Sequence, residues 1–302
     1  MQIDIKSWIY AARLRTLPLS LSGITLSALI AYSRGFKVDL VFIMVFLTTL
    51  SLQILANFAD DYGDGVKGTD NASRIGPERA VQSGRISPRS MKKALLFLGK
   101  LCLLFGMLLI YLSFKTYRAP APLIFIFIIF TCLYASIKYT IGQDAYGYKG
   151  QGDLSVFLFF GLVSVQGSYF LYTHHFEWDV LLLATAIGFL SMAVLNLNNM
   201  RDIHSDYQSN KYTFVVQIGL YKAKIYHLFL VLLPFALGSL FVKLNQHQLI
   251  YHWAFLILLI PVFFHLKKIF SISDLKKFDP ELKKIALITL LYALIIGLGQ
   301  VF

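Results

Sequence analysis

Long apolar segments alternate with short polar ones along almost the whole chain. A helix that crosses a membrane needs about 20 mostly apolar residues, and we count nine segments of about this length. They lie near residues 17–34, 38–60, 93–114, 120–138, 154–173, 179–199, 225–243, 251–270 and 284–301. The pattern predicts an all-α polytopic membrane protein with about nine transmembrane helices. Residues 1–302 are expected to form one domain, because no low-complexity stretch or linker divides them.

The composition supports the same class. Of the 302 residues 57% are hydrophobic and only 15% are charged, whereas soluble domains have roughly 45–50% apolar and about 25% charged residues. The first 20 residues mix charges with aromatic side chains, which favours a short amphipathic segment at the membrane interface over a cleavable signal. Cys102 and Cys132 fall within predicted spans, where isolated thiols serve as small apolar fillers.

The net charge of +12 raises the question of a nucleic-acid partner. With the N-terminus placed in the cytoplasm, however, most of the 28 Lys and Arg residues fall in the cytoplasmic loops. This distribution follows the positive-inside rule. The net positive charge is therefore explained by the orientation of the chain in the membrane, and no nucleic-acid binding is expected. The predicted location is a bacterial cytoplasmic (inner) membrane, with the lipid bilayer as the surrounding partner and no obligate protein partner indicated.

Two acidic segments follow predicted spans on the same side of the membrane. The first, "NFADDYGDGVKGTD", places Asn57, Asp60 or Asp61, and Asp64 on one helical face, with Asp70 beyond them in a loop. The second, "VLNLNNMRDIHSD", places Asn198, Asp202 and Asp206 on one face. Clustered carboxylates repel each other unless cations lie between them. Because Mg²⁺ prefers carboxylates, water and substrate phosphates, the two segments predict a metal–diphosphate site in a central cavity open to the cytoplasmic side.

Basic residues adjoin both acidic segments. Those placed to contact phosphate oxygens are Lys67, Arg74, Arg79, Arg201 and Lys211. Two other interpretations stay open: solvated loop charges, and the cation site of a membrane transporter. The transporter accounts less well for aspartates that sit at helix ends beside basic loops.

The motifs resemble those of a known family. The stretches "ARLRTLPLS", "DYGDGVKGTD", "RIGPERAVQSG", "YGYKGQGDLSVFLFFG" and "LNLNNMRDIHSD" occur in the order found in the UbiA superfamily of intramembrane prenyltransferases. They are most similar to its 1,4-dihydroxy-2-naphthoate polyprenyltransferase branch, which acts in menaquinone biosynthesis. The first motif departs at Asp60, where the family commonly has Asn. For this reason Asp60 is a weaker candidate ligand than Asp61, Asp64, Asp202 or Asp206.

The resemblance implies an activity and a set of site residues. The activity is Mg²⁺-dependent transfer of a polyprenyl group from polyprenyl diphosphate to 1,4-dihydroxy-2-naphthoate, with loss of CO₂ and diphosphate, giving demethylmenaquinone. The metal ligands implied are Asp60, Asp61, Asp64, Asp70, Asp202 and Asp206, and the catalytic residues are Asp61, Asp64, Lys67, Asp202 and Asp206. The diphosphate-binding residues implied are Asn57, Lys67, Arg74, Arg79, Asn198, Arg201 and Lys211.

The segment "YTIGQDAYGYKGQGD", residues 139–153, is the candidate for handling the aromatic acceptor. Its proposed acceptor-binding residues are Tyr139, Tyr146, Tyr148, Lys149 and Asp153, which offer ring stacking, a cation and a proton acceptor. Tyrosines at a membrane boundary also serve as plain interfacial anchors. Prenylation of a different acceptor, such as 4-hydroxybenzoate or homogentisate, remains an alternative within the same enzyme class.

Overall fold

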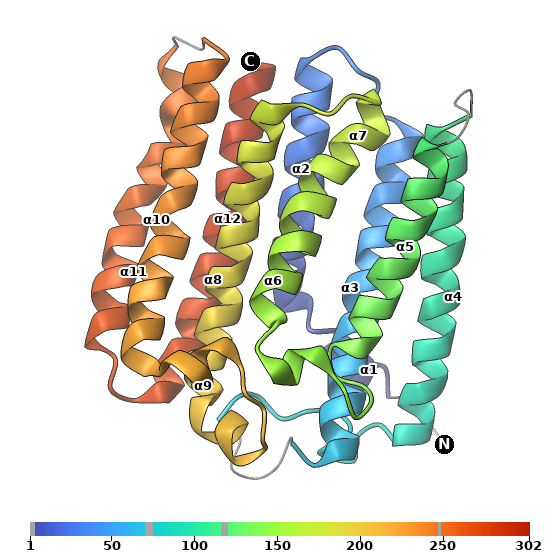
Figure 1. Ribbon diagram of the computed structural model, residues 1–302, viewed down its shortest axis with the longest axis vertical. Coiled ribbons are helices and arrows are strands. Elements are labelled where there is room, and N and C mark those ends of the chain that lie inside the picture. Colours follow the sequence, from blue (N-terminus) through green and yellow to red (C-terminus); the bar gives the residue numbers. More distant parts are fainter. Residues whose placement is uncertain (1–3, 70–74, 116–119, 247–248) are drawn as a thin grey trace.

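A computed structural model describes residues 4–69, 75–115, 120–246 and 249–302. The described residues are almost entirely helical and contain no strand, as predicted (Figure 1). The long helices are α2 (Leu17–Ser33), α3 (Leu40–Lys67), α4 (Pro88–Ser113), α5 (Ala121–Lys138), α8 (Trp178–Gln208), α10 (Leu220–Leu244), α11 (Leu259–Ser271) and α12 (Phe278–Val301). The shorter elements are α1 (Ile5–Ala12), η1 (Leu14–Thr16), η2 (Tyr146–Lys149), α6 (Gly152–Val156), η3 (Phe157–Gly167), α7 (Ser168–Thr173), α9 (Phe214–Ile218), η4 (Ile250–Leu258) and η5 (Leu275–Lys277).

Nine helical segments within the described part of the chain are long and apolar enough to cross a membrane. They are Ile5–Ser33, Leu40–Lys67, Pro88–Ser113, Ala121–Lys138, Gly152–Thr173, Trp178–Gln208, Leu220–Leu244, Ile250–Ser271 and Leu275–Val301. Each contains most of one predicted span. The second and sixth extend well beyond the predicted ends at 60 and 199, so the first acidic segment is helical up to Lys67 and the second is helical through Asp206.

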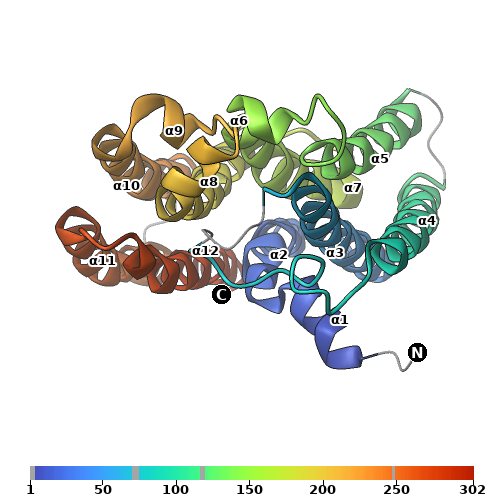
Figure 2. The same ribbon diagram turned by 90° about the horizontal axis from the view of Figure 1, so that it is seen from below.

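The helices run side by side, and α8 lies next to α10 and α12 (Figures 1 and 2). It packs against α10, η3 and α12, while α2 packs against α12, η3 and α7, and α3 packs against α4 and α5. The segments that contain α1, η2 and α9 gather at the lower end of Figure 1. The same end carries the C-terminal turns of α3 and α8, so the acidic motifs share one end of the molecule.

The N-terminal helix α1 is amphipathic, as the sequence predicts. Asp4 caps it by accepting a hydrogen bond from the backbone N–H of Lys6. Ser7 is buried against the bundle, while Ile5 and Ile9 are 67% and 51% exposed. Exposed isoleucines on one face, at the end where the spans begin, suit a helix that lies in the membrane interface.

A buried polar cluster joins α10, α11 and α12. Glu281 is fully buried and accepts hydrogen bonds from Lys284 Nζ at 2.7 Å and His265 Nδ1 at 2.7 Å. Lys268 Nζ lies 3.0 Å from the same carboxylate. The other ring nitrogen of His265, Nε2, lies 2.8 Å from Nε2 of His227. These contacts fix the first turn of α12 to its neighbours.

We expect Glu281→Ala to destabilise the fold by about 2 kcal/mol, because it leaves the buried His265 without its charged acceptor, although the half-exposed Lys268 and Lys284 can turn to solvent. The measurement is the midpoint of thermal unfolding in detergent. Glu78→Ala is the control, since Glu78 is 67% exposed and its ion pair with Arg85 lies at the surface. Equal midpoints for the two variants would contradict a stabilising role for the cluster.

Candidate active site

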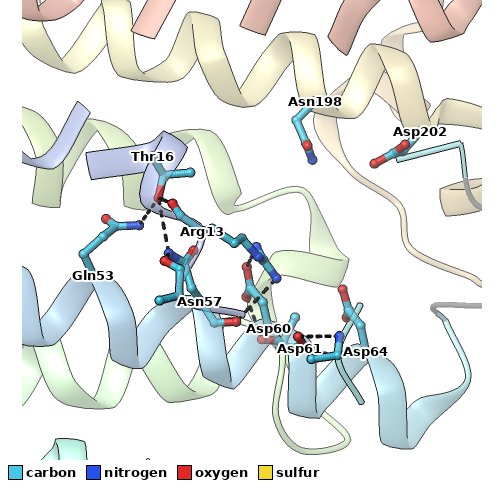
Figure 3. Close-up of polar contacts among 12 residues, drawn as sticks. Arg13, Thr16, Gln53, Asn57, Asp60, Asp61, Asp64, Asn198 and Asp202 are labelled. Carbon is cyan, nitrogen blue, oxygen red and sulfur yellow. Dashed lines mark hydrogen bonds and ion pairs between the residues drawn. The ribbon is translucent and has the colours of Figure 1, made fainter. Parts of the chain in front are cut away.

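A cavity of about 200 Å³ lies between the C-terminal halves of α3 and α8. Four carboxylates line it: Asp60 and Asp64 from α3, and Asp202 and Asp206 from α8. Figure 3 shows Asp60 and Asp64 on one wall, with Asn198 and Asp202 on the wall opposite. The structure therefore brings the two acidic motifs together across one cavity.

Cations line the same cavity. They are Arg13, Arg15, Arg79, Lys211 and Lys283. Lys211 Nζ lies 3.5 Å from Asp64 Oδ2. Burial alone lowers the pKa of Lys211, but the negative charges of Asp64 and Asp206 outweigh this effect, so its pKa is raised and it stays protonated at neutral pH.

Asp60 points into the cavity and is held from two sides. It accepts a hydrogen bond from Thr140 Oγ1 at 2.9 Å and forms an ion pair with Arg13 Nη1 at 3.3 Å. Arg13 follows α1 in a left-handed backbone conformation, with φ at 49°. Gly63 allows the segment that carries Thr140 to approach α3, because a Cβ at position 63 would lie 2.9 Å from the Thr140 side chain.

Asp61 has a different environment from the one expected. Its side chain does not line the cavity and the residue is 1% exposed. Its two oxygens accept hydrogen bonds from the backbone N–H groups of Ala80 and Val81, at 3.0 and 2.9 Å. The expected ranking of Asp61 above Asp60 as a ligand therefore disagrees with the geometry. Asp61 instead anchors the segment that carries Arg79 to the cavity wall.

Asn57 joins the N-terminal segment to α3. Its side-chain amide donates to the backbone carbonyl of Ala12 at 2.9 Å and to Thr16 Oγ1 at 3.2 Å. Gln53 also donates to Thr16 Oγ1, at 3.1 Å (Figure 3). These contacts fix the turn that holds Arg13. Asn57 does not line the polar cavity, whereas Arg13 does, so Asn57 acts on diphosphate binding through Arg13 and not through the direct contact that was expected.

Arg201 lies behind the cavity wall rather than in it. It is 1% exposed and donates to both oxygens of Asp202, from Nε at 2.9 Å and from Nη2 at 2.6 Å. The Nη2 atom also donates to Asn198 Oδ1 at 2.8 Å, and Nη1 donates to Asp279. Arg201 therefore orients Asn198 and Asp202, which do line the cavity, and the expected direct contact with phosphate disagrees with its burial.

Lys67 also falls outside the cavity. Its side chain is exposed, and the ammonium lies 4.1 Å from the ring centre of Tyr148. Asp70 and Arg74, two further expected site residues, lie outside the described residues.

The segment 139–153 contributes tyrosines to the site, in unequal roles. Tyr139 lines the cavity, and Tyr146 lines an adjoining chamber and donates to the backbone carbonyl of Ala135 at 2.9 Å. Tyr148 donates to Asp64 Oδ1 at 2.6 Å. Burial, and then the charge of Asp64, raise the pKa of Tyr148, so its phenol remains a donor. Burial, and then the charges of Asp60 and Asp153, raise the pKa of Tyr139 well above its ordinary value.

The two remaining candidates from this segment lie apart from the cavity. Lys149 forms an exposed ion pair with Asp144 at 2.9 Å. Asp153 accepts a hydrogen bond from Tyr226 at 3.1 Å and is 8% exposed. Neither lines the cavity or the adjoining chamber, so the expected direct roles in acceptor binding disagree with their positions.

A mostly apolar chamber of about 300 Å³ adjoins the polar cavity. Its walls come mainly from α3, α5 and η3. The two spaces share the residues Asp60, Tyr139, Val156, Phe160 and Leu195. On α3 the chamber extends from Asp60 back to Val45, which corresponds to about 22 Å of helix. A molecule with a charged head and a long apolar tail matches this pair of spaces.

The donor set suits Mg²⁺ bound together with a substrate. Within the described ranges, no three His, Cys, Asp or Glu side chains come together closely enough to hold an ion by themselves. The cavity instead offers carboxylates on two facing walls. Mg²⁺ commonly uses one or two carboxylates and completes its octahedron with water and phosphate oxygens, so these residues fit an ion shared with a diphosphate.

Several cavity residues were absent from the predicted site. They include Arg13, Arg15, Thr69, Asn199 and Lys283. The available signal for the two arginines was their place directly before the first span, in "ARLRTLPLS", where positive charge was attributed to topology. Lys283 comes from the start of α12, and no local motif connects it with the acidic segments.

Solved structures with this arrangement of helices include a UbiA homolog from Aeropyrum pernix K1, with a TM-score of 0.66 and 14% identity over 93% of this chain and 96% of that one. Another, a UbiA homolog from Archaeoglobus fulgidus bound to GPP and Mg²⁺, has a TM-score of 0.63 and 13% identity over 96% of this chain and 99% of that one. At these identities the likeness shows the fold alone.

Two bacterial enzymes are more similar to this chain in sequence than those solved structures are. The chain is 40% identical to a 1,4-dihydroxy-2-naphthoate octaprenyltransferase from Haemophilus influenzae, over 75% of this chain and 74% of the relative. It is 39% identical to the enzyme of the same name from Escherichia coli, over 83% of this chain and 81% of the relative. The sequence pattern of the UbiA prenyltransferase family matches residues 20–296 of this chain. On the strength of that match and these relatives, this chain belongs to the UbiA prenyltransferase family.

Proposed function

We propose that this protein transfers a polyprenyl group from polyprenyl diphosphate to 1,4-dihydroxy-2-naphthoate. Diphosphate and CO₂ leave, and the product is demethylmenaquinone in its reduced form. The observation that carries the proposal is the polar cavity, with carboxylates on two facing walls, joined to an apolar chamber. The named activity of relatives that are 39–40% identical over most of their length supports the choice of acceptor.

Binding of the first substrate uses both spaces. The prenyl tail lies in the apolar chamber, and the diphosphate lies in the polar cavity within reach of Arg13, Arg15, Arg79, Lys211 and Lys283. Asp64, Asp202 and Asp206, with Asp60, would hold Mg²⁺ beside the diphosphate. When bound, the ion supplies Lewis-acid stabilisation of the negative charge on the leaving group.

The reaction takes place where the two spaces meet. As the allylic C–O bond breaks, the cavity cations stabilise the charge that grows on the diphosphate. The ring carbon that bears the carboxylate of the acceptor forms the new C–C bond, and that carboxylate leaves as CO₂. Tyr139 lies at the junction, since it lines both spaces, and we assign it to packing against the acceptor ring. Its raised pKa keeps the phenol neutral and excludes it as a phenolate base at neutral pH.

The activity is tested with purified protein, Mg²⁺, a polyprenyl diphosphate and 1,4-dihydroxy-2-naphthoate, read by mass spectrometry. We expect a prenylated product that lacks the carboxyl group and that disappears when EDTA is added. Product formed only with 4-hydroxybenzoate or homogentisate would move the enzyme to another pathway. Failure with every acceptor, together with ion-dependent uptake into proteoliposomes, would favour a transporter.

Two buried aspartates on α3 provide a matched pair of variants. Asp64→Asn should lower kcat by about 100-fold or more, with the fold retained, because it removes a charged cavity ligand. Asp61→Asn should lower the free energy of unfolding by about 1–3 kcal/mol, because an amide NH₂ would face a backbone N–H. Activity and thermal unfolding are measured for both. If Asp61→Asn is inactive but as stable as the wild type, Asp61 would be assigned as a metal ligand after all.

We also propose that the acidic motifs lie on the cytoplasmic side of a bacterial inner membrane, that the N-terminus lies on that side, and that residues 1–302 act as one prenyltransferase domain. The support is the basic character of the loops at that end.

The two ends of α4 test the orientation. Lys92 lies in its first turns and Lys115 lies two residues beyond its last residue, and both side chains are exposed. The native thiols Cys102 and Cys132 are buried and give little background. In right-side-out vesicles an impermeant maleimide should label Lys115→Cys at once, and Lys92→Cys only after permeabilisation. The reverse pattern would invert the topology.

A further inference from the structure

Asp279, in the first turn of α12, contacts two arginines that come from distant parts of the sequence. One oxygen lies 3.5 Å from Arg15 Nη1, and the other accepts a hydrogen bond from Arg201 Nη1. Its side chain is 28% exposed, whereas that of Arg201 is 1% exposed. Asp279 is thus the carboxylate that joins α12 to the N-terminal segment and to α8.

Arg201 transmits this contact to the cavity. Its guanidinium donates to both oxygens of Asp202 and to Asn198, while its remaining nitrogen, Nη1, donates to Asp279. A guanidinium is planar, so a partner on one edge fixes the direction of the other. Asp279 therefore determines how Arg201 holds Asp202, one of the cavity carboxylates.

The charges at this point are balanced. Two guanidinium groups, those of Arg15 and Arg201, meet two carboxylates, those of Asp202 and Asp279. Without Asp279, both arginines would act on Asp202, and the added positive charge would oppose a divalent cation. The same change would attract an anionic diphosphate more strongly. The two ligands therefore respond in opposite directions to loss of the Asp279 charge.

We propose that Asp279 is a positioning residue for the divalent cation that binds with the diphosphate. It orients Arg201 and offsets the charges of Arg15 and Arg201, so that Asp202 keeps its strength as an anionic ligand. This inference rests on the proposed function, and it assigns a role to a residue outside both acidic motifs.

The test is Asp279→Asn, a change that keeps the shape and removes the charge. The Mg²⁺ concentration for half-maximal turnover should rise about tenfold, while the KM for the aromatic acceptor stays the same. Independently of turnover, the Kd for Mn²⁺ at saturating inorganic diphosphate, read by electron paramagnetic resonance, should rise by a similar factor. Asp279→Glu should remain within about threefold of the wild type. Asp274→Asn is the control, because Asp274 is exposed and lies just before α12.

A second variant tests the charge argument should Asp279→Asn fail to fold. Arg15→Gln removes a cation from the same wall, so at saturating inorganic diphosphate it should bind Mn²⁺ more tightly than the wild type. Unchanged Mn²⁺ and Mg²⁺ dependence in Asp279→Asn, or equal or weaker Mn²⁺ binding in Arg15→Gln, would overturn the proposal. If the wild type binds Mn²⁺ with diphosphate but forms no prenylated product, the proposed function is refuted. The Mn²⁺ affinities of Asp279→Asn and the wild type would still decide the role of Asp279.

Discussion

The repulsion between carboxylates that face each other across the cavity is the constraint on which the rest of the site depends. Like charges close to hydrocarbon are costly unless cations or hydrogen-bond donors surround them. Here Asp60 has Arg13, Asp64 has Lys211 and Tyr148, and Asp202 has Arg201. Arg201 is the neighbour of Asp202 on α8, but the other partners come from distant parts of the chain. The need to neutralise these carboxylates therefore draws the N-terminal segment, the 139–153 segment and the loop after α8 to one end of the bundle.

The arrangement also shows why some charged residues line the cavity while others support it. Arg201 and Asp61 are both almost completely buried, and each uses its polar atoms on protein partners. Buried charges of this kind fix geometry, because removing one partner leaves the other without compensation. The residues that line the cavity combine charge with access, which is what binding of a diphosphate requires.

Much of the fold was predictable from the sequence, because the apolar segments are long and spanning helices must satisfy their own backbone groups. The helical spacing of the two motifs likewise predicted that Asp64, Asp202 and Asp206 would share a site. Spacing could not separate Asp60 from Asp61, since positions i+3 and i+4 both lie on the helical face of Asn57. Only the docking of residues 79–81 decides which of the two faces the cavity. Arg13, Lys283 and Asp279 were missed because tertiary packing alone brings them to the motifs.

The shared wall between the polar cavity and the apolar chamber has a consequence for the direction of transfer. A substrate that carries both a diphosphate and a tail is held in both spaces at once, through residues such as Asp60 and Phe160 that border each of them. The proposed product has lost the diphosphate and the carboxylate, so it retains only the apolar contacts. The polar cavity would then discriminate between the substrate and the product by charge alone, and loss of that hold would favour departure of the product into the surrounding lipid.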